Sequence, residues 1–124
     1  METSLYEQVG GQPFFERLVT GFYDAVENDE LLRAMYPTDL TESKRHLTLF
    51  LVQYWGGPDH YMQERGHPRL RMRHAPFRIT KEARDAWIVA MGTALAGERS
   101  GLTDEQFAEL NSYFDMAATQ MRNV

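Results

Sequence analysis

Apolar residues recur at helical spacing along most of this chain of 124 residues. One such set runs through residues 15–26, and another runs through residues 47–54. Two further helices are expected after Thr80 and after Thr103, because each threonine can cap a helix whose apolar face follows. No segment alternates convincingly with the period of two that a half-buried strand needs. The pattern therefore predicts one all-α domain over residues 1–124.

Glycine and proline mark where these helices should begin and end. Gly10-Gly11 is expected to end a short first turn, and Gly56-Gly57 is expected to end the helix that contains residues 47–54. Thr41 is positioned to cap that helix. The polar stretch from residue 59 to 78 is expected to hold only short helical pieces, because glycine and proline interrupt it.

The composition narrows the chemistry that this domain can perform. Thirteen Lys and Arg against 18 Asp and Glu give a net charge of −5, which argues against general nucleic-acid binding. The chain has no cysteine, so disulfides, thiol nucleophiles and cysteine-held metal clusters are excluded. No apolar run is long enough to span a bilayer, and no secretory signal is visible. We therefore expect no membrane partner and a cytoplasmic location.

Among the four histidines, His74 has a distinctive position. Leu70 lies four residues before it and Phe77 three residues after it, so one helical turn places the three side chains on one face. Pro76 ends the turn, and a backbone carbonyl one turn back can accept a hydrogen bond from the ring. A neutral imidazole held in this way is what a haem iron needs from a protein. The alternative is a structural histidine, which is the commoner role of a lone histidine in a helical protein.

Positive charge is concentrated around His74. No acidic residue occurs between Arg65 and Lys81, a stretch that also contains Arg69, Arg71, Arg73 and Arg78. These arginines could pair with the two carboxylates of a haem, or with the phosphates of a nucleotide or nucleic acid. They could equally form a solvated surface that pairs with acids elsewhere in the chain.

Three polar aromatic residues form the third feature of interest. Tyr23, Tyr36 and Trp87 each place one hydrogen-bond donor on a large apolar body. If all three faced one pocket, they would suit a bound polar diatomic molecule. Taken one at a time, each is more often a core residue with a single hydrogen bond.

Five segments of the chain together resemble the group II truncated haemoglobins, the HbO-like type of bacteria and plants. They are the residues at 22–26, 35–37, 50–58, 66–79 and 86–88. The segment GlyHisProArgLeuArgMetArgHisAlaProPheArgIle at 66–79 is the most specific of them. The resemblance runs from about Leu5 to the C-terminus. It implies a shortened globin in which two helix pairs pack two over two around haem b, the iron protohaem IX.

The resemblance also implies a set of site residues. It makes His74 the proximal iron ligand, and it implies that the remaining cofactor-binding residues are Leu70, Arg73, Phe77, Leu47, Phe50, His46, Tyr61 and Met91. It implies that the residues facing the ligand on the distal side are Tyr23, Tyr36, Trp87 and Ser43. Ser43 stands where many globins have a distal histidine, and His46 stands where a basic residue often meets a propionate.

The activity implied by the resemblance is reversible binding of oxygen, carbon monoxide or nitric oxide at ferrous haem. A second hypothesis is a haem enzyme with peroxidase-like or nitric-oxide dioxygenase-like activity, for which a reductase is a candidate partner. A third, from a different class, is a haem-free helical module that binds an anionic partner through the arginines. The sequence leaves open whether the chain is a monomer or a homodimer.

Overall fold

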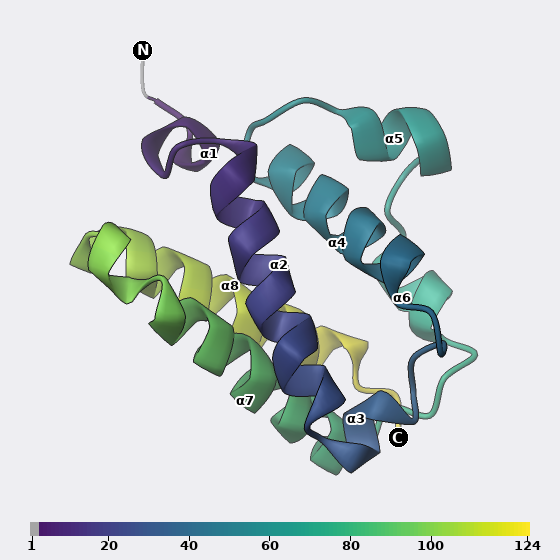
Figure 1. Ribbon diagram of the computed structural model, residues 1–124. Coiled ribbons are helices and arrows are strands. Elements are labelled where there is room, and N and C mark those ends of the chain that lie inside the picture. The colour runs from purple at the N-terminus through teal and green to yellow at the C-terminus, as the bar shows by residue number, and fades with distance from the viewer. Residues whose placement is uncertain (1–2) are drawn as a thin grey trace.

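The computed structural model describes residues 3–124, so the first two residues of the expected 1–124 domain lie outside it. Within this range the regular structure is helical, without strands, which confirms the all-α prediction. The helices, coloured along the chain in Figure 1, are α1 (Leu5–Gln8), α2 (Gln12–Glu27), α3 (Glu30–Arg33), α4 (Thr41–Tyr54), α5 (His60–Arg65), α6 (Leu70–His74), α7 (Lys81–Gly97), the 3₁₀ turn η1 (Arg99–Gly101) and α8 (Asp104–Met121). In the described part of the chain, no helix is both long and apolar enough to cross a membrane.

Two helix pairs form the body of the domain. Helix α2 packs on α4 in one layer, α7 packs on α8 in the other, and α2 crosses α7 between the layers (Figure 1). This is the two-over-two arrangement that the resemblance implied. The apolar stripe predicted on α2 is the centre of the core, and its fully buried members are Phe15, Leu18, Val19, Phe22 and Val26. Their removal from water supplies the main force that holds the layers together.

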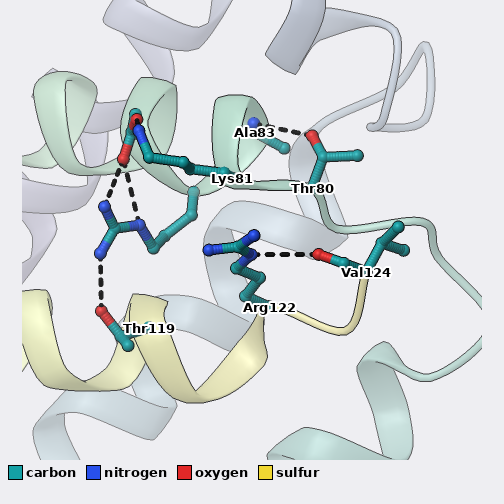
Figure 2. A network of polar contacts seen from close by, with 8 residues as sticks. Thr80, Lys81, Ala83, Thr119, Arg122 and Val124 are labelled. Carbon is teal, nitrogen blue, oxygen red and sulfur yellow. Dashed lines mark hydrogen bonds and ion pairs between the residues drawn. The ribbon is translucent and has the colours of Figure 1, made fainter.

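Two of the predicted helix caps are present. The hydroxyl of Thr80 accepts a hydrogen bond from the amide of Ala83 at 3.2 Å, which Figure 2 shows at the start of α7. Thr103 and Gln106 form a reciprocal capping box at the start of α8, with hydrogen bonds of 3.0 and 3.1 Å. Each cap satisfies backbone donors that a helix leaves without a partner at its first turn.

The prediction that Thr41 caps α4 is wrong. Thr41 is the first residue of the helix, Leu40 occupies the capping position, and neither side chain caps the helix. The Asp39 carboxylate instead accepts a hydrogen bond from the Thr41 amide at 3.0 Å. This backbone hydrogen bond is also the main cause of the lowered pKa of Asp39. An acid two residues before Thr41 thus performs the role that the sequence pattern assigned to the threonine.

A polar network ties α7 to α8 near the start of α7. Arg84 donates to Asp85 at 3.0 Å through Nε and to the hydroxyl of Thr119 at 3.0 Å through Nη1, and Lys81 pairs with Asp85 at 2.7 Å. Figure 2 shows Lys81 and Thr119 on the two facing helices. The second helix pair is therefore joined by polar contacts as well as by its apolar faces.

The turn after α4 depends on two consecutive glycines. Gly56 has a φ of 102°, a conformation that side-chain-bearing residues rarely adopt. Gly57 is required for a different reason: a Cβ at this position would lie 2.7 Å from Val52 Cγ1 and 2.8 Å from the ring of Tyr6. The close approach lets α1 pack against the end of α4, where the amide of Tyr6 donates to the carbonyl of Trp55 at 3.0 Å.

We predict that Gly57→Ala lowers the free energy of unfolding by about 1–3 kcal/mol, because the added methyl group has no free space and forces the α1–α4 contact apart. Chemical denaturation measures the change. Gly97→Ala is the matched control, because a Cβ there meets nothing within 4 Å and Gly97 lies in the last turn of α7. If the two variants had equal stability, the steric explanation for Gly57 would be wrong.

Candidate functional site

A large cavity of about 710 Å³ lies between the two layers of helices. Its wall is formed by side chains from α2 to α8, and most of them are apolar. This volume falls in the range of cavities that bind organic cofactors. The helices therefore frame a partly open cavity that their own side chains do not fill.

Twelve of the thirteen site residues implied by the resemblance line this one cavity. They are Tyr23, Tyr36, Ser43, His46, Leu47, Phe50, Tyr61, Leu70, Arg73, His74, Phe77 and Trp87. They come from several helices and from the segments beside them, so it is the packing of the two layers that brings them together.

Met91 is the exception, and its assignment as a cavity wall is corrected here. Its side chain is fully buried and borders a separate small hollow between α7 and α8. Met91 lies one helical turn beyond Trp87. The cavity wall is formed at Trp87, whose ring lies 6.1 Å from that of Phe114. The spacing placed Met91 on the correct face of α7, but too far along the helix.

The His74 ring is held in one orientation by its own helix. Nδ1 lies 2.6 Å from the carbonyl oxygen of Leu70, one turn back along α6. A carbonyl only accepts hydrogen bonds, so Nδ1 carries a proton, and the tautomer that fits this contact has its lone pair on Nε2. The ring is half-buried and lines the cavity. The contact thus fixes the orientation of His74 and leaves Nε2 as the ring nitrogen that suits a metal ion.

The backbone that follows His74 is fixed by Asn123, a residue that the sequence analysis did not identify. The Asn123 side chain donates to the carbonyls of Phe77 at 2.8 Å and His74 at 3.4 Å, and it accepts from the amide of Ile79 at 2.9 Å. The Asn123 amide donates to the carbonyl of Ile79 at 3.0 Å. These partners are 44 to 49 residues away in sequence, so no local pattern could have indicated them.

Arg73 holds the loop that precedes α6. Its Nε donates to the carbonyl of Pro68 at 2.7 Å, and its Nη2 donates to those of Arg65 at 2.8 Å and His67 at 3.4 Å. The resemblance placed Arg73 near a haem propionate. The guanidinium does border the cavity, but several of its hydrogen bonds organise the loop. Arg65 and Arg84 also border the cavity and add positive charge that the sequence analysis did not assign to it.

Helix α8 contributes a wall of the cavity, although the sequence analysis named none of its residues for the site. Its lining residues are Tyr113, Phe114, Ala117, Ala118 and Met121. Periodicity shows which face of a helix is apolar, but it does not show whether that face meets another helix or an open space. The one indication in the sequence is the pair Ala117 and Ala118, because small side chains on a helix leave space for a ligand beside it.

The polar aromatic residues form one connected group at the cavity wall. The rings of Tyr23 and Tyr36 meet edge to face, with their centroids 5.5 Å apart. The Trp87 side chain lies beside the Tyr36 hydroxyl and that of Ser43 beside the Tyr23 hydroxyl, and each lowers the pKa of its phenol. An indole N–H can only donate, so Trp87 can interact with the Tyr36 oxygen only as a donor, and the Tyr36 hydroxyl proton stays free to point elsewhere.

Burial is the main cause of the altered titration of these phenols. Desolvation raises the pKa of Tyr36 to about 12, against a smaller lowering by the Trp87 hydrogen bond. Desolvation, followed by the neighbouring Tyr36, raises the pKa of Tyr23 further. Both side chains are therefore neutral hydrogen-bond donors over the physiological pH range. At the rim, partial desolvation and then Arg65 lower the pKa of His46, whose Nε2 lies 3.4 Å from a Glu42 oxygen.

These features fit a haem. The porphyrin brings four nitrogen ligands of its own, so its iron needs only one side chain from the protein, and the oriented Nε2 of His74 can serve as that ligand. Among residues 3–124 there is no cluster of three His, Asp or Glu side chains that could hold a bare metal ion. The apolar walls suit the porphyrin ring, and the arginines that border the cavity, Arg65, Arg73 and Arg84, suit its carboxylates.

Comparison with known proteins shows the same class. Residues 4–123 match the family of bacterial-like globins. The group 2 truncated hemoglobin YjbI of Bacillus subtilis is 42% identical over 118 residues, which cover 95% of this chain and 87% of the relative. The crystal structure of the hemoglobin from Chloroflexus aurantiacus is 47% identical with a TM-score of 0.93, covering 99% of this chain and 100% of that one. The truncated oxygen-avid haemoglobin from Bacillus subtilis is 40% identical with a TM-score of 0.89, covering 98% and 100%.

Fold, cavity and relatives together define the class as a haem globin. The chain belongs to the bacterial-like globin family, among the group II truncated haemoglobins. Membership implies a haem cofactor with its iron and small diatomic ligands.

The buried phenol of Tyr36 gives a prediction about alkaline pH. Its pKa is raised from 10.0 to about 12, so the folded state holds the proton more tightly than the unfolded state does. This contribution to stability is complete below pH 10 and is lost as the pH rises toward 12. We expect wild type and Tyr36→Phe to show the same number of ionising tyrosines between about pH 9 and 11 in an ultraviolet titration. One additional tyrosine titrating near pH 10 in the wild type would contradict the burial of Tyr36.

Proposed function

We propose that this protein binds haem b with His74 as the proximal iron ligand and binds oxygen reversibly beside Tyr23, Tyr36 and Trp87. The observation that carries the proposal is the 2.6 Å contact of His74 Nδ1 with the Leu70 carbonyl at the wall of a 710 Å³ cavity. This contact directs Nε2 to the metal on a half-buried ring that lines a cavity of suitable volume.

The other histidines support this choice of ligand. His60 and His67 are exposed and do not line the cavity. His46 does line it, but its Nε2 lies beside the Glu42 carboxylate, which suits a residue that meets charge at the rim. His74 therefore combines a fixed tautomer with a place in the cavity wall, and none of the other three does.

The residues around the cavity have separate roles in this proposal. When bound, ferrous haem supplies an iron that takes up a diatomic ligand and passes more negative charge to oxygen than to carbon monoxide. Apolar residues such as Leu47 and Phe50 hold the porphyrin and exclude water, and Arg65 and Arg73 face its carboxylates. The Tyr36 hydroxyl, held by the Trp87 N–H, donates to the ligand, and a donor stabilises a charged acceptor more than a neutral one.

The same donors support a second candidate function, that of a haem enzyme. A ligand stabilised by hydrogen bonds leaves slowly, and a slowly leaving ligand is better suited to reaction than to transport. Peroxidase-like or nitric-oxide dioxygenase-like turnover would distinguish this candidate. A protein that binds oxygen but shows no turnover with peroxide or nitric oxide is a binder only.

We predict that His74→Ala abolishes the five-coordinate ferrous haem spectrum, because the variant lacks the side chain that bonds to the iron. Some haem is expected to remain through apolar contact and carboxylate pairing. Visible absorption of the ferrous protein, with and without added imidazole, measures the loss and its rescue. His67→Ala is the control, since His67 is exposed and lies outside the cavity. An unchanged ferrous spectrum in His74→Ala would show that another residue holds the iron.

We predict that Trp87→Phe speeds oxygen dissociation roughly tenfold or more, because it keeps the apolar ring and removes the donor that holds Tyr36. The effect on carbon monoxide should be smaller. Stopped-flow displacement measures both rates. The effects of Trp87→Phe and Tyr36→Phe should not add in the double variant, since in this proposal the two side chains act together on one bound ligand. If Tyr23→Phe accelerates release while Trp87→Phe does not, Tyr23 is the main donor instead.

A further inference from the structure

A group of exposed side chains lies outside the cavity on its His74 side. It consists of Arg69, Arg71, Arg78, Met72 and Phe77, and we call it the rim patch. All five side chains are exposed, and only Phe77 also borders the cavity. The patch is therefore a surface that adjoins the haem site and meets its wall only at Phe77. Figure 1 shows α6 on the opposite side of the molecule from the turn between α7 and α8.

The three arginines of the rim patch differ from most other arginines of the protein. They form no ion pair with any residue in the range 3–124. The arginines that do pair with carboxylates are Arg17, Arg33, Arg45, Arg84 and Arg99, all outside residues 65–78. Unpaired charge is thus concentrated in the rim patch. Two haem carboxylates would be met by the arginines that face the cavity, so the charge of the rim patch stays available.

The rim patch also exposes large apolar side chains. Met72 is 59% exposed, and Phe77, which also borders the cavity, is 49% exposed. Arginine, methionine and aromatic residues are enriched in protein interfaces, whereas lysine is depleted. The Lys and Arg positions from residue 65 to 78 are all arginines. This composition favours a protein partner over a small polyanion, which would need only the charge.

The backbone beneath the rim patch is already ordered. Arg73 fixes the loop before α6 through the carbonyls of Arg65 and Pro68, and Asn123 fixes the segment after it through those of Phe77 and Ile79. A surface that is ordered before binding loses less entropy when a partner docks on it.

The charge distribution indicates the sign of the partner. Residues 65–81 contain six of the 13 cations and none of the 18 acids, in a chain of net charge −5. An acidic protein would be repelled by most of the surface and attracted to the rim patch, which steers it to one orientation beside the haem cavity.

We propose that the rim patch is the docking surface for an acidic electron-donor protein that keeps the haem ferrous. This inference rests on the proposed haem function, because ferric haem does not bind oxygen and needs one electron to do so. In the step, one electron leaves the reduced partner, which becomes oxidised, and the ferric cofactor becomes ferrous. No covalent bond is formed or broken. Docking at the rim patch places the donor beside the cavity and shortens the distance that the electron must cross.

The test compares two double variants of the haem-loaded protein with equal changes in net charge. Arg71→Gln/Arg78→Gln alters the rim patch, whereas Arg17→Gln/Arg99→Gln removes two arginines elsewhere, Arg99 in η1 at the far end of α7. The probe is reduced flavodoxin, an acidic flavoprotein, and the measured quantity is the bimolecular rate constant of haem reduction at low ionic strength. We expect about a tenfold fall for the rim variant, a weaker salt dependence, and less than about a twofold change for the control.

Two further measurements make the test specific. A neutral hydroquinone should reduce all three proteins at the same rate, since it needs no charged surface. Oxidised flavodoxin should shift the backbone amide resonances of residues 69–78 in the wild type and shift them much less in the rim variant.

The outcomes separate the two proposals. Equal reduction rates in wild type and the rim variant would overturn the docking surface. An equal fall of the rate in both double variants would overturn it as well, because the effect would then come from net charge alone. If the rim variant instead lost binding to phosphatidylglycerol vesicles and kept its flavodoxin rate, the patch would bind lipid. A wild-type protein that takes up no haem would defeat the proposed function itself, and the electron transfer with it.

Discussion

The fold is constrained by the need to keep a cavity of about 710 Å³ open inside a chain of only 124 residues. An open apolar cavity weakens a protein, because the side chains that line it lose packing partners. The two crossed helix pairs compensate with a dense core around α2, where five large side chains are fully buried. A ligand that fills the cavity stabilises the folded state by binding it and not the unfolded chain. The structure thus combines one tightly packed contact between the layers with one large cavity.

That combination explains how the site residues are held. The segment with His74 forms only a short helix and buries none of its residues completely, so apolar packing does little to fix it. Hydrogen bonds hold this segment instead, since the Leu70 carbonyl orients the ring, Arg73 holds the loop before α6, and Asn123 holds the backbone after it. The distal donors are fixed differently, since Tyr23 is buried in the α2 core and Tyr36 is held against Trp87. The two sides of the cavity are therefore stabilised by different interactions, hydrogen bonds on the His74 side and burial on the side of Tyr23 and Tyr36.

The arginines show how one residue type can serve several roles in a small protein. Arg84 joins α7 to α8 through Thr119, Arg73 organises a loop, and Arg65 borders the cavity. The exposed arginines of the rim patch have no such internal role. In a chain of net negative charge, unpaired positive charge beside the cofactor cavity is best explained by interaction with another molecule.

Much of this protein could be predicted from local sequence. The helical periodicity, the caps at Thr80 and Thr103, and the glycines that turn the chain after α4 act between near neighbours, so their consequences can be read along the chain. The one-turn contact from His74 to Leu70 is equally local and was predicted. The family resemblance supplied twelve residues that the structure brings to one cavity.

Only the tertiary structure decided which apolar faces pack against a helix and which line the cavity. Helix α8 forms a cavity wall although none of its residues was assigned to the site, and Met91 was expected in the cavity wall and lies in the core. Asn123 and Arg84 act on partners 35 or more residues away, beyond the reach of any local pattern. The physical reason is that periodicity specifies the direction of a side chain, whereas its surroundings depend on how far each helix extends across its neighbours.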